Sequence, residues 1–251
     1  MSFKQLLSRK TCRSITRNTA LIAALVLAIP AFSGTPVACI VPDNGTDGAD
    51  MPPVGCSYVS LSPMAIVDGL PPGSSIACDA TMDSFFDITY IADPAGDGGT
   101  TVFSARLGLD MTGSGGLGGF PRTAFFDVFV RGRESPTRCC HGGKPYFTDL
   151  ARMQGQLPPG DPDFDLLRIT AGDEFGLPSP GQTTVTSAAP GGWSVDSFFD
   201  ITYRIDFVGK PGGALSGMSG STTGTIRMQS GVTAPVAVES DTWGGFKSLY
   251  R

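Results

Sequence analysis

Apolar and polar side chains alternate with a period of two along residues 195–207. One face of this segment carries a mostly apolar set: Val195, Ser197, Phe199, Ile201, Tyr203, Ile205 and Phe207. The opposite face carries Asp196, Phe198, Asp200, Thr202, Arg204 and Asp206. Alternation over this length is typical of an antiparallel strand with one buried face, whereas a helix would distribute the acids around its circumference.

Part of this segment repeats elsewhere in the chain. Residues 83–90, DSFFDITY, recur without change as residues 196–203, and residues 125–128, FFDV, form a weaker third copy. The alternation predicts that the first copy turns Phe86, Ile88 and Tyr90 inward. The middle copy is expected to turn inward Phe126, Val128 and Val130, with Asp127 and Arg131 facing outward. We infer an internally repeated strand unit, with copies near 66–113, 120–157 and 157–231.

Further short apolar segments, separated by Gly-rich and Pro-rich turns, predict strands at 57–61, 64–67, 101–111, 147–157, 164–170, 182–187 and 222–229. Many short strands at such spacing indicate an all-β, antiparallel, sandwich-like fold. The β-rich domain is expected to span 56–231. Residues 34–55, rich in Gly, Pro and Asp, are predicted to form a flexible acidic linker. Residues 232–251 form a C-terminal tail, in which Trp243, Phe246 and Tyr250 could share one face of a short helix.

Residues 1–33 have the three parts of a cleavable secretory signal peptide. Five basic residues precede an apolar run that ends at Pro30, and Ala31-Phe32-Ser33 offers small residues for cleavage. The run is shorter than the roughly 20 residues that span a bilayer, so no stable membrane span is expected after cleavage. The sequence therefore predicts a secreted or extracytoplasmic protein, in the periplasm or at the cell surface. Pro36 departs from a lipoprotein box, which disfavours lipidation of Cys39.

Charge narrows the range of partners. The chain has 18 Lys and Arg and 23 Asp and Glu, and the signal peptide holds five of the bases and none of the acids, leaving a formal charge of −10. A phosphate backbone needs cationic side chains, so nucleic acid is a poor partner. A glycan or another surface protein remains open as the partner.

Export also changes which cysteine chemistry is expected. Cys39, Cys56, Cys78, Cys139 and Cys140 remain after cleavage. An oxidising compartment favours disulfides, and the candidates are Cys56, Cys78, Cys139 and Cys140. Cys56–Cys78 is the preferred pair, because these residues flank one short apolar segment. The odd count leaves one cysteine free, lipidated or bonded to another chain.

Catalytic motifs are weak. His141 is the only histidine, and it follows Cys139-Cys140 without a second ligand pair at the spacing of a zinc site. No Gly-x-Ser-x-Gly elbow, His-Glu-x-x-His motif or dinucleotide fingerprint is present. Acid–base catalysis by two carboxylates remains possible, so an extracellular polysaccharide hydrolase is one alternative function. Its candidate acids are Asp83 and Asp87, Asp196 and Asp200, and Asp161, Asp163 and Asp165. A concave site near Asp83, Asp127 and Asp196 would favour this alternative.

Calcium is the candidate cofactor. Asp161, Asp163 and Asp165 form an acidic cluster, and residues 43–50 place Asp and Asn among glycines. The second segment lacks the Glu that an EF-hand loop needs at its twelfth position, where Val54 stands. The alternatives to a calcium-stabilised adhesion domain are an acidic turn and a flexible linker.

Residues 157–231, with GDPDFDLLRITAGDEFGLPSPGQTT and the FFDITYRIDFVG segment, resemble a set of uncharacterised exported bacterial β-rich proteins. The resemblance implies export and a recurring domain, and it implies no activity and no catalytic residue. Together with the repeat and the missing motifs, it favours a non-enzymatic structural or binding module, secreted or held at the cell surface.

Overall fold

The chain was analysed as a computed structural model, which describes residues 39–45, 48–94, 98–134, 143, 145–188 and 191–230. All of them belong to one compact unit, Gly34–Arg251. The strands are β1 Cys39–Pro42, β2 Tyr58–Ser60, β3 Met64–Ile66, β4 Ser75–Ala92, β5 Gly99–Ser114, β6 Pro121–Glu134, β7 Tyr146–Gln156, β8 Phe164–Ala171, β9 Gly181–Ala188, β10 Gly192–Gly209 and β11 Ser219–Ser230. Two short 3-10 turns, η1 Gly115–Leu117 and η2 Asp173–Phe175, follow β5 and β8. The signal peptide, the C-terminal tail and the Cys139-Cys140-His141 cluster lie outside the described residues.

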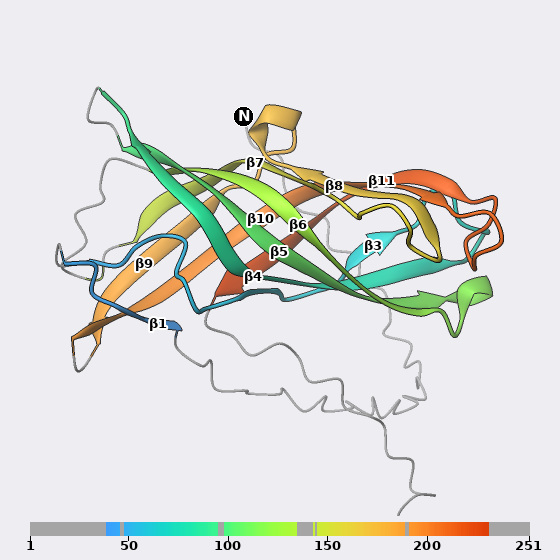
Figure 1. Cartoon of the computed structure of the whole chain (residues 1–251), viewed down its shortest axis with the longest axis horizontal. Coiled ribbons are helices and arrows are strands. Elements are labelled where there is room, and N and C mark those ends of the chain that lie inside the picture. Colours follow the sequence, from blue (N-terminus) through green and yellow to red (C-terminus); the bar gives the residue numbers. More distant parts are fainter. Residues whose placement is uncertain are drawn as a thin grey trace, which may run out of the picture. The chain divides into compact units, whose positions relative to one another are not determined.

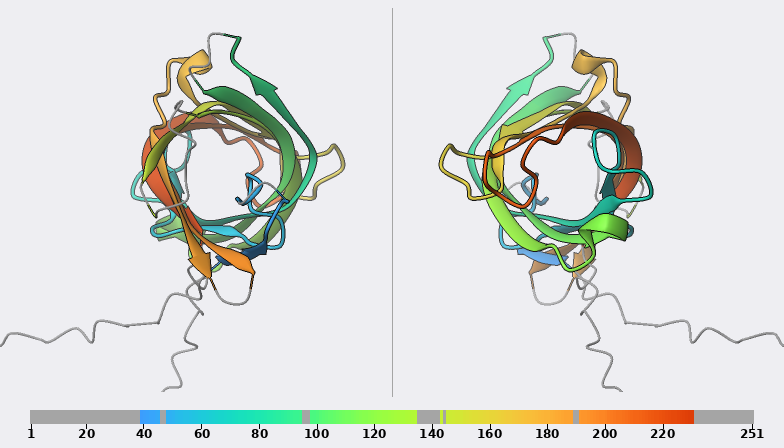
Figure 2. Two further views of the ribbon diagram at one scale, coloured as in Figure 1. Left: turned by 90° about the vertical axis from the view of Figure 1, so that its left-hand side faces the viewer. Right: turned by 90° about the vertical axis from the view of Figure 1, so that its right-hand side faces the viewer.

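The strands form one antiparallel sheet that closes on itself (Figure 1). The order around it is β10, β11, β2, β4, β5, β6, β7 and β8, and β8 pairs again with β10. Viewed along the axis, these strands make a ring (Figure 2). β1, β3 and β9 extend its walls by pairing with β10 and β4. The prediction of an all-β, sandwich-like fold is confirmed, since opposite walls of the closed sheet pack face to face across one core.

The predicted inward face of residues 195–207 is confirmed in β10. Ile205 is fully buried, Phe207 is 1% exposed, and the polar Ser197 is also fully buried among them. β6 likewise buries Phe126, Val128 and Val130. The predicted strands at 57–61, 64–67, 101–111, 147–157, 164–170, 182–187 and 222–229 all correspond to strands of the closed sheet. Among the described residues, no helix is long and apolar enough to cross a membrane.

The first copy of the octapeptide folds differently from the second. The expectation that Phe86, Ile88 and Tyr90 point inward is wrong: these side chains are 38–40% exposed, whereas Phe85 is 8% exposed. The pairing of β4 with β5 shifts register twice, after Asp83 and after Phe86. Ser84 and Asp87 lie at these shifts with φ of 52° and 53°, so each bulge changes which side chains face the core.

The described residues of the expected flexible linker, 39–45 and 48–55, are folded against the closed sheet. Within residues 34–55, β1 pairs with the start of β10, and Met51 and Pro52 are buried. Trp193 anchors the intervening loop, because its indole Nε1 donates a hydrogen bond to Asp43 Oδ2 at 2.7 Å. The linker prediction is wrong because composition shows only how much apolar surface the segment itself can bury. Here the segment covers apolar surface of β10, which is far along the chain.

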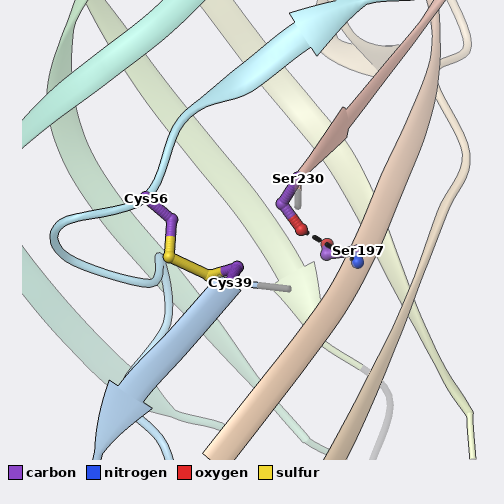
Figure 3. Close-up of a disulfide and its surroundings, with 4 residues drawn as sticks. All are labelled: Cys39, Cys56, Ser197 and Ser230. Carbon is purple, nitrogen blue, oxygen red and sulfur yellow. Dashed lines mark hydrogen bonds between the residues drawn. A yellow bond between two sulfur atoms is a disulfide. The ribbon is translucent and has the colours of Figure 1, made fainter. Parts of the chain in front are cut away.

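The preferred disulfide is also corrected. Cys56 bonds to Cys39, not to Cys78 (Figure 3). Cys78 is a free thiol on the inner face of β4, fully buried in the core. Desolvation by burial, with a further contribution from the charge of Asp79, raises the pKa of Cys78 to about 12. The Cys39 sulfur is engaged in the disulfide and is therefore not free to carry a lipid.

Candidate functional site

A largely apolar cavity of about 40 Å³ lies at one end of the closed sheet. We call it the inner chamber; its apolar lining includes Tyr58, Met82, Phe103, Val130, Leu150, Met153, Phe199 and Ile201. The chamber exists because side chains from β2, β4, β5, β6, β7 and β10 all point to the axis of the closed sheet. A cavity of this size has room for a few water molecules, since one needs roughly 10–15 Å³. An apolar lining disfavours water, so the chamber suits apolar atoms better.

One carboxylate interrupts the apolar lining. Glu134, the last residue of β6, is 7% exposed and lines the chamber. The hydroxyl of Thr101, on β5, donates a hydrogen bond to Glu134 Oε1 at 2.7 Å. Because Thr101 is 4% exposed, this contact lies away from solvent, where a hydrogen bond is stronger than in water. Glu134 is the only carboxylate in the lining, whose other polar members are Thr101, Arg133, Thr148 and Thr183.

A row of buried hydroxyl groups adjoins the chamber. Thr183 Oγ1 lies 3.1 Å from Thr148 Oγ1 and 2.8 Å from Ser197 Oγ. Ser197 also donates its backbone N–H to Ser230 Oγ at 3.0 Å, a contact drawn in Figure 3. Burial raises the pKa of the nearby Tyr58, although its hydrogen bond with Ser197 acts in the opposite sense. These groups satisfy one another, which holds β7, β9, β10 and β11 in register at this end.

Two lining residues of the chamber, Met51 and Pro52, come from a loop outside the closed sheet, and we call them the plug. The loop lies between β1 and β2, and Met51 also packs with Val41 and Trp193 in a second, smaller apolar cluster. The Cys39–Cys56 disulfide spans this loop, with a sequence separation of 17. The plug is therefore carried on a short covalent loop and not on the closed sheet itself.

The acids that the sequence nominates for catalysis lie on the outer face. Arg106 of β5 is directly opposite Asp83 of β4 and Asp127 of β6 in the strand register, so the three residues form one row across the sheet. Asp83 and Asp127 are separated by two strand spacings, about 10 Å in all at roughly 4.8 Å each. Asp196 is on β10 and receives a hydrogen bond from Gln229 at 3.3 Å. The structure thus brings Asp83 and Asp127 into one row and leaves Asp196 in another part of the sheet.

One of these acids does border a concavity. An open hollow of about 370 Å³ is lined by Val54, Gly55, Cys56, Ser57, Asp83, Ser84 and Phe85. It is formed by the bulge at Ser84, whose hydroxyl donates to Asp83 Oδ1 at 2.9 Å. Neither Asp127 nor Asp196 lines it. The hollow is polar and supplies a single carboxylate.

The acidic cluster at 161–165 acts as a structural turn. Asp161 accepts hydrogen bonds at its Oδ1 from the backbone amides of Asp163 and Phe164, at 2.9 and 3.1 Å, and its Oδ2 pairs with Arg122. Desolvation raises the pKa of Asp161, but the hydrogen bonds from these three partners outweigh it and lower the pKa overall. Among the described residues, no three His, Cys, Asp or Glu side chains group as they would to hold a metal ion. Calcium binding by Asp161, Asp163 and Asp165 stays a prediction.

Sequence reasoning missed the chamber and its acidic group. One signal pointed to it: continuing the inward alternation of Val128 and Val130 by two further steps reaches Glu134. The pattern cannot show that Thr101 would lie opposite or that Met51 would cover the end. Comparison of the chain with family models, curated proteins and solved structures finds no match. The function must therefore be argued from the site alone.

Proposed function

We propose that this chain is an exported, non-enzymatic binding module whose inner chamber holds a small, largely apolar molecule with one hydrogen-bond donor. The observation that carries the proposal is the chamber itself: a largely apolar lining with one buried carboxylate, Glu134, and with Met51 and Pro52 contributed by the loop between β1 and β2. Small-molecule sites are commonly apolar concavities with a few fixed polar groups that orient the ligand. Closed antiparallel sheets of eight strands can hold one small ligand inside.

The ligand would enter by displacing the plug. The present cavity of about 40 Å³ admits only a few atoms, so a larger molecule needs the space that Met51 occupies. The apolar body would then contact Phe103 and Leu150, and its donor would reach Glu134. The disulfide would keep the plug close enough to close again over the ligand.

Export is the second part of the proposal. The signal-like residues 1–33 and the Cys39–Cys56 disulfide support it, because disulfides persist in oxidising compartments. Glycan or surface-protein binding would use the outer face instead, where Asp83 borders the open hollow. For the hydrolase alternative, Asp83 and Asp127 lie in one row across the sheet, with Arg106 between them.

The proposal is tested with N-phenyl-1-naphthylamine, a fluorescent apolar probe that carries one N–H donor. We expect its fluorescence to rise on binding the full mature chain. Val130→Phe fills the chamber and should weaken binding about tenfold or more, which corresponds to roughly 1.4 kcal/mol. Met51→Ala should strengthen binding because it enlarges the opening. Met64→Ala removes a fully buried methionine that does not line the chamber, and it should leave binding unchanged.

The variants also distinguish probe binding in the chamber from probe binding at other apolar surfaces. Probe binding that is absent, or that is the same in the wild type and Val130→Phe, would contradict the proposal. Thermal melting of each variant shows whether it is folded, since overpacking of a core costs about 1–3 kcal/mol.

A further inference from the structure

The Cys39–Cys56 disulfide fixes both ends of the segment that carries the plug. Cys39 is the first residue of β1, and Cys56 lies two residues before β2 (Figure 3). The bond therefore closes a covalent ring that contains Met51 and Pro52. Met51 is only five residues from Cys56 along the chain, so its position in the chamber depends on where that cysteine is held.

The remaining attachment of this segment to the sheet is limited. β1 has four residues and, among the described strands, pairs with β10 alone. Backbone hydrogen bonds from Asn44 to Gly48 and from Cys56 to Pro53 stay within the segment itself. Segments with few backbone hydrogen bonds to the rest of a fold open locally at a low free energy. The disulfide therefore contributes to how rarely β1 and the plug detach.

The size of that contribution follows from the length of the ring. The two cysteines are 17 residues apart. A bond that closes a loop of this length restricts the open chain enough to change an opening equilibrium about a hundredfold. β1 is not one of the strands that close the sheet, since β8 pairs directly with β10. Loss of the bond should thus free β1 and the plug while the closed sheet stays folded.

The two sulfur atoms differ in their access to solvent. Cys39 is 5% exposed, whereas Cys56 is half-buried and lines the open hollow of about 370 Å³. Exchange begins when a thiolate attacks one sulfur of a disulfide, and access decides which one. The hollow therefore directs attack to Cys56. Asp83 lines the same hollow, and its negative charge opposes the approach of a thiolate. Cys78 is fully buried in the core, so it is not the attacking thiol.

We propose that the Cys39–Cys56 disulfide is a redox switch for the inner chamber: its reduction by a dithiol frees the plug, and ligand then enters and leaves faster. One thiolate of the dithiol attacks Cys56, and Cys39 leaves as a thiolate that takes up a proton. The second thiolate attacks the mixed disulfide and releases Cys56. Two electrons pass to the protein, and the dithiol becomes a disulfide. The inference rests on the proposed function, because it concerns ligand access to the same chamber.

The test measures the release of bound N-phenyl-1-naphthylamine from the full mature chain after rapid dilution, before and after treatment with dithiothreitol. We expect reduction to raise the release rate about tenfold or more and reoxidation to restore the slow rate. The double variant Cys39→Ser, Cys56→Ser should release the probe rapidly with or without dithiothreitol. Cys78→Ala is the matched control, because it removes a thiol outside the ring and should respond to dithiothreitol as the wild type does. Melting curves establish that the variants are folded.

A second pair of variants tests the route of attack. Alkylation at timed intervals, followed by mass spectrometry, gives the rate at which dithiothreitol reduces the Cys39–Cys56 bond. Asp83→Asn removes the charge in the hollow and should raise this rate severalfold at low ionic strength. Asp127→Asn makes the same change in net charge in the same outer row, but Asp127 does not line the hollow. It should change the rate less.

The outcomes separate this inference from the proposed function. Probe release at equal rates from the oxidised and reduced chain would overturn the switch and leave the chamber as a binding site. Absence of probe binding in both forms would overturn the proposed function and the switch together. A disulfide that resists dithiothreitol until the chain unfolds would overturn the switch, because the hollow would then give no access to Cys56. Equal acceleration by Asp83→Asn and Asp127→Asn would overturn the hollow as the route.

Discussion

The two copies of the octapeptide allow the same substitution to be made in two conformations of one sequence. Asp87 and Asp200 have identical neighbours along the chain for three residues on either side. Asp87 has a φ of 53°, in the left-handed region, whereas Asp200 lies in the regular ladder between β10 and β11. Replacing each with glycine should therefore have effects of different size and direction.

The magnitudes follow from the backbone. A left-handed conformation costs a residue with a Cβ about 1–2 kcal/mol, and glycine removes that cost while losing about 0.5–1 kcal/mol through its freer unfolded state. Asp87→Gly should thus be neutral or stabilising by up to about 1 kcal/mol. Asp200→Gly relieves no backbone strain, and it carries the same entropic cost from the freer unfolded state, so it should destabilise the fold by about 0.5–1 kcal/mol. It also removes a contact with Arg227, which adds little because both side chains are about two-fifths exposed.

Valine should reverse the order. A β-branched side chain is strongly disfavoured at the positive φ of Asp87, so Asp87→Val should destabilise the fold by about 1–2 kcal/mol. At Asp200 valine suits an extended strand, and Asp200→Val should have a small effect.

Urea and thermal denaturation of the four variants measure these differences. For a domain of this size, about 1 kcal/mol corresponds to roughly 2–4 °C in Tm. Asp87→Gly should melt at or above the wild-type temperature, with Asp200→Gly below it, and Asp87→Val should melt lowest of the four. Equal destabilisation by glycine at both positions would refute the bulged conformation of β4.

Three further experiments address other parts of the fold. Asp161→Ala should lower the free energy of unfolding, measured by urea denaturation, by about 3 kcal/mol, because it leaves the partly buried Arg122 and two backbone amides without their acceptor. Asp161→Asn should lower it less, because the side-chain amide oxygen still accepts hydrogen bonds from these groups. Folding lowers the pKa values of Asp161 and Asp206, so their contribution to stability is full above about pH 5 and is lost progressively as the pH falls through the lowered pKa values. A stability profile that is flat down to about pH 2 would contradict this. Replacing Cys39 and Cys56 with serine should cost about 3 kcal/mol, and in that variant Cys78 should react with thiol reagents only after unfolding.

Much of the fold could be read from the sequence because alternation records which face of a strand is buried. β10 keeps period two from Val195 to Phe207, and its buried face agrees with that pattern. The seven shorter strands were recognisable because turns rich in Gly and Pro separate them. Export and the acidic surface follow from composition, and they stay predictions here.

The first octapeptide shows the limit of this reasoning. Residues 83–90 and 196–203 are identical, yet Phe85 is buried in one copy and Phe199 faces inward in the other. Local preference is the same in both, so the difference arises from partners. β10 is held in regular ladders on both edges, whereas among the described residues the second half of β4 pairs with β5 alone and can bulge.

The chamber, the plug and the disulfide were decided by tertiary structure alone. Glu134 and Thr101 come together because β5 and β6 are neighbours and the sheet closes around them. Cys39 meets Cys56 because β1 docks on β10, about 150 residues away along the chain. The sequence by itself determined which segments become strands and, in most of them, which face is apolar. Closure of the sheet determined what those faces enclose, because a periodic pattern specifies one side of a strand but not the strand that will lie across from it.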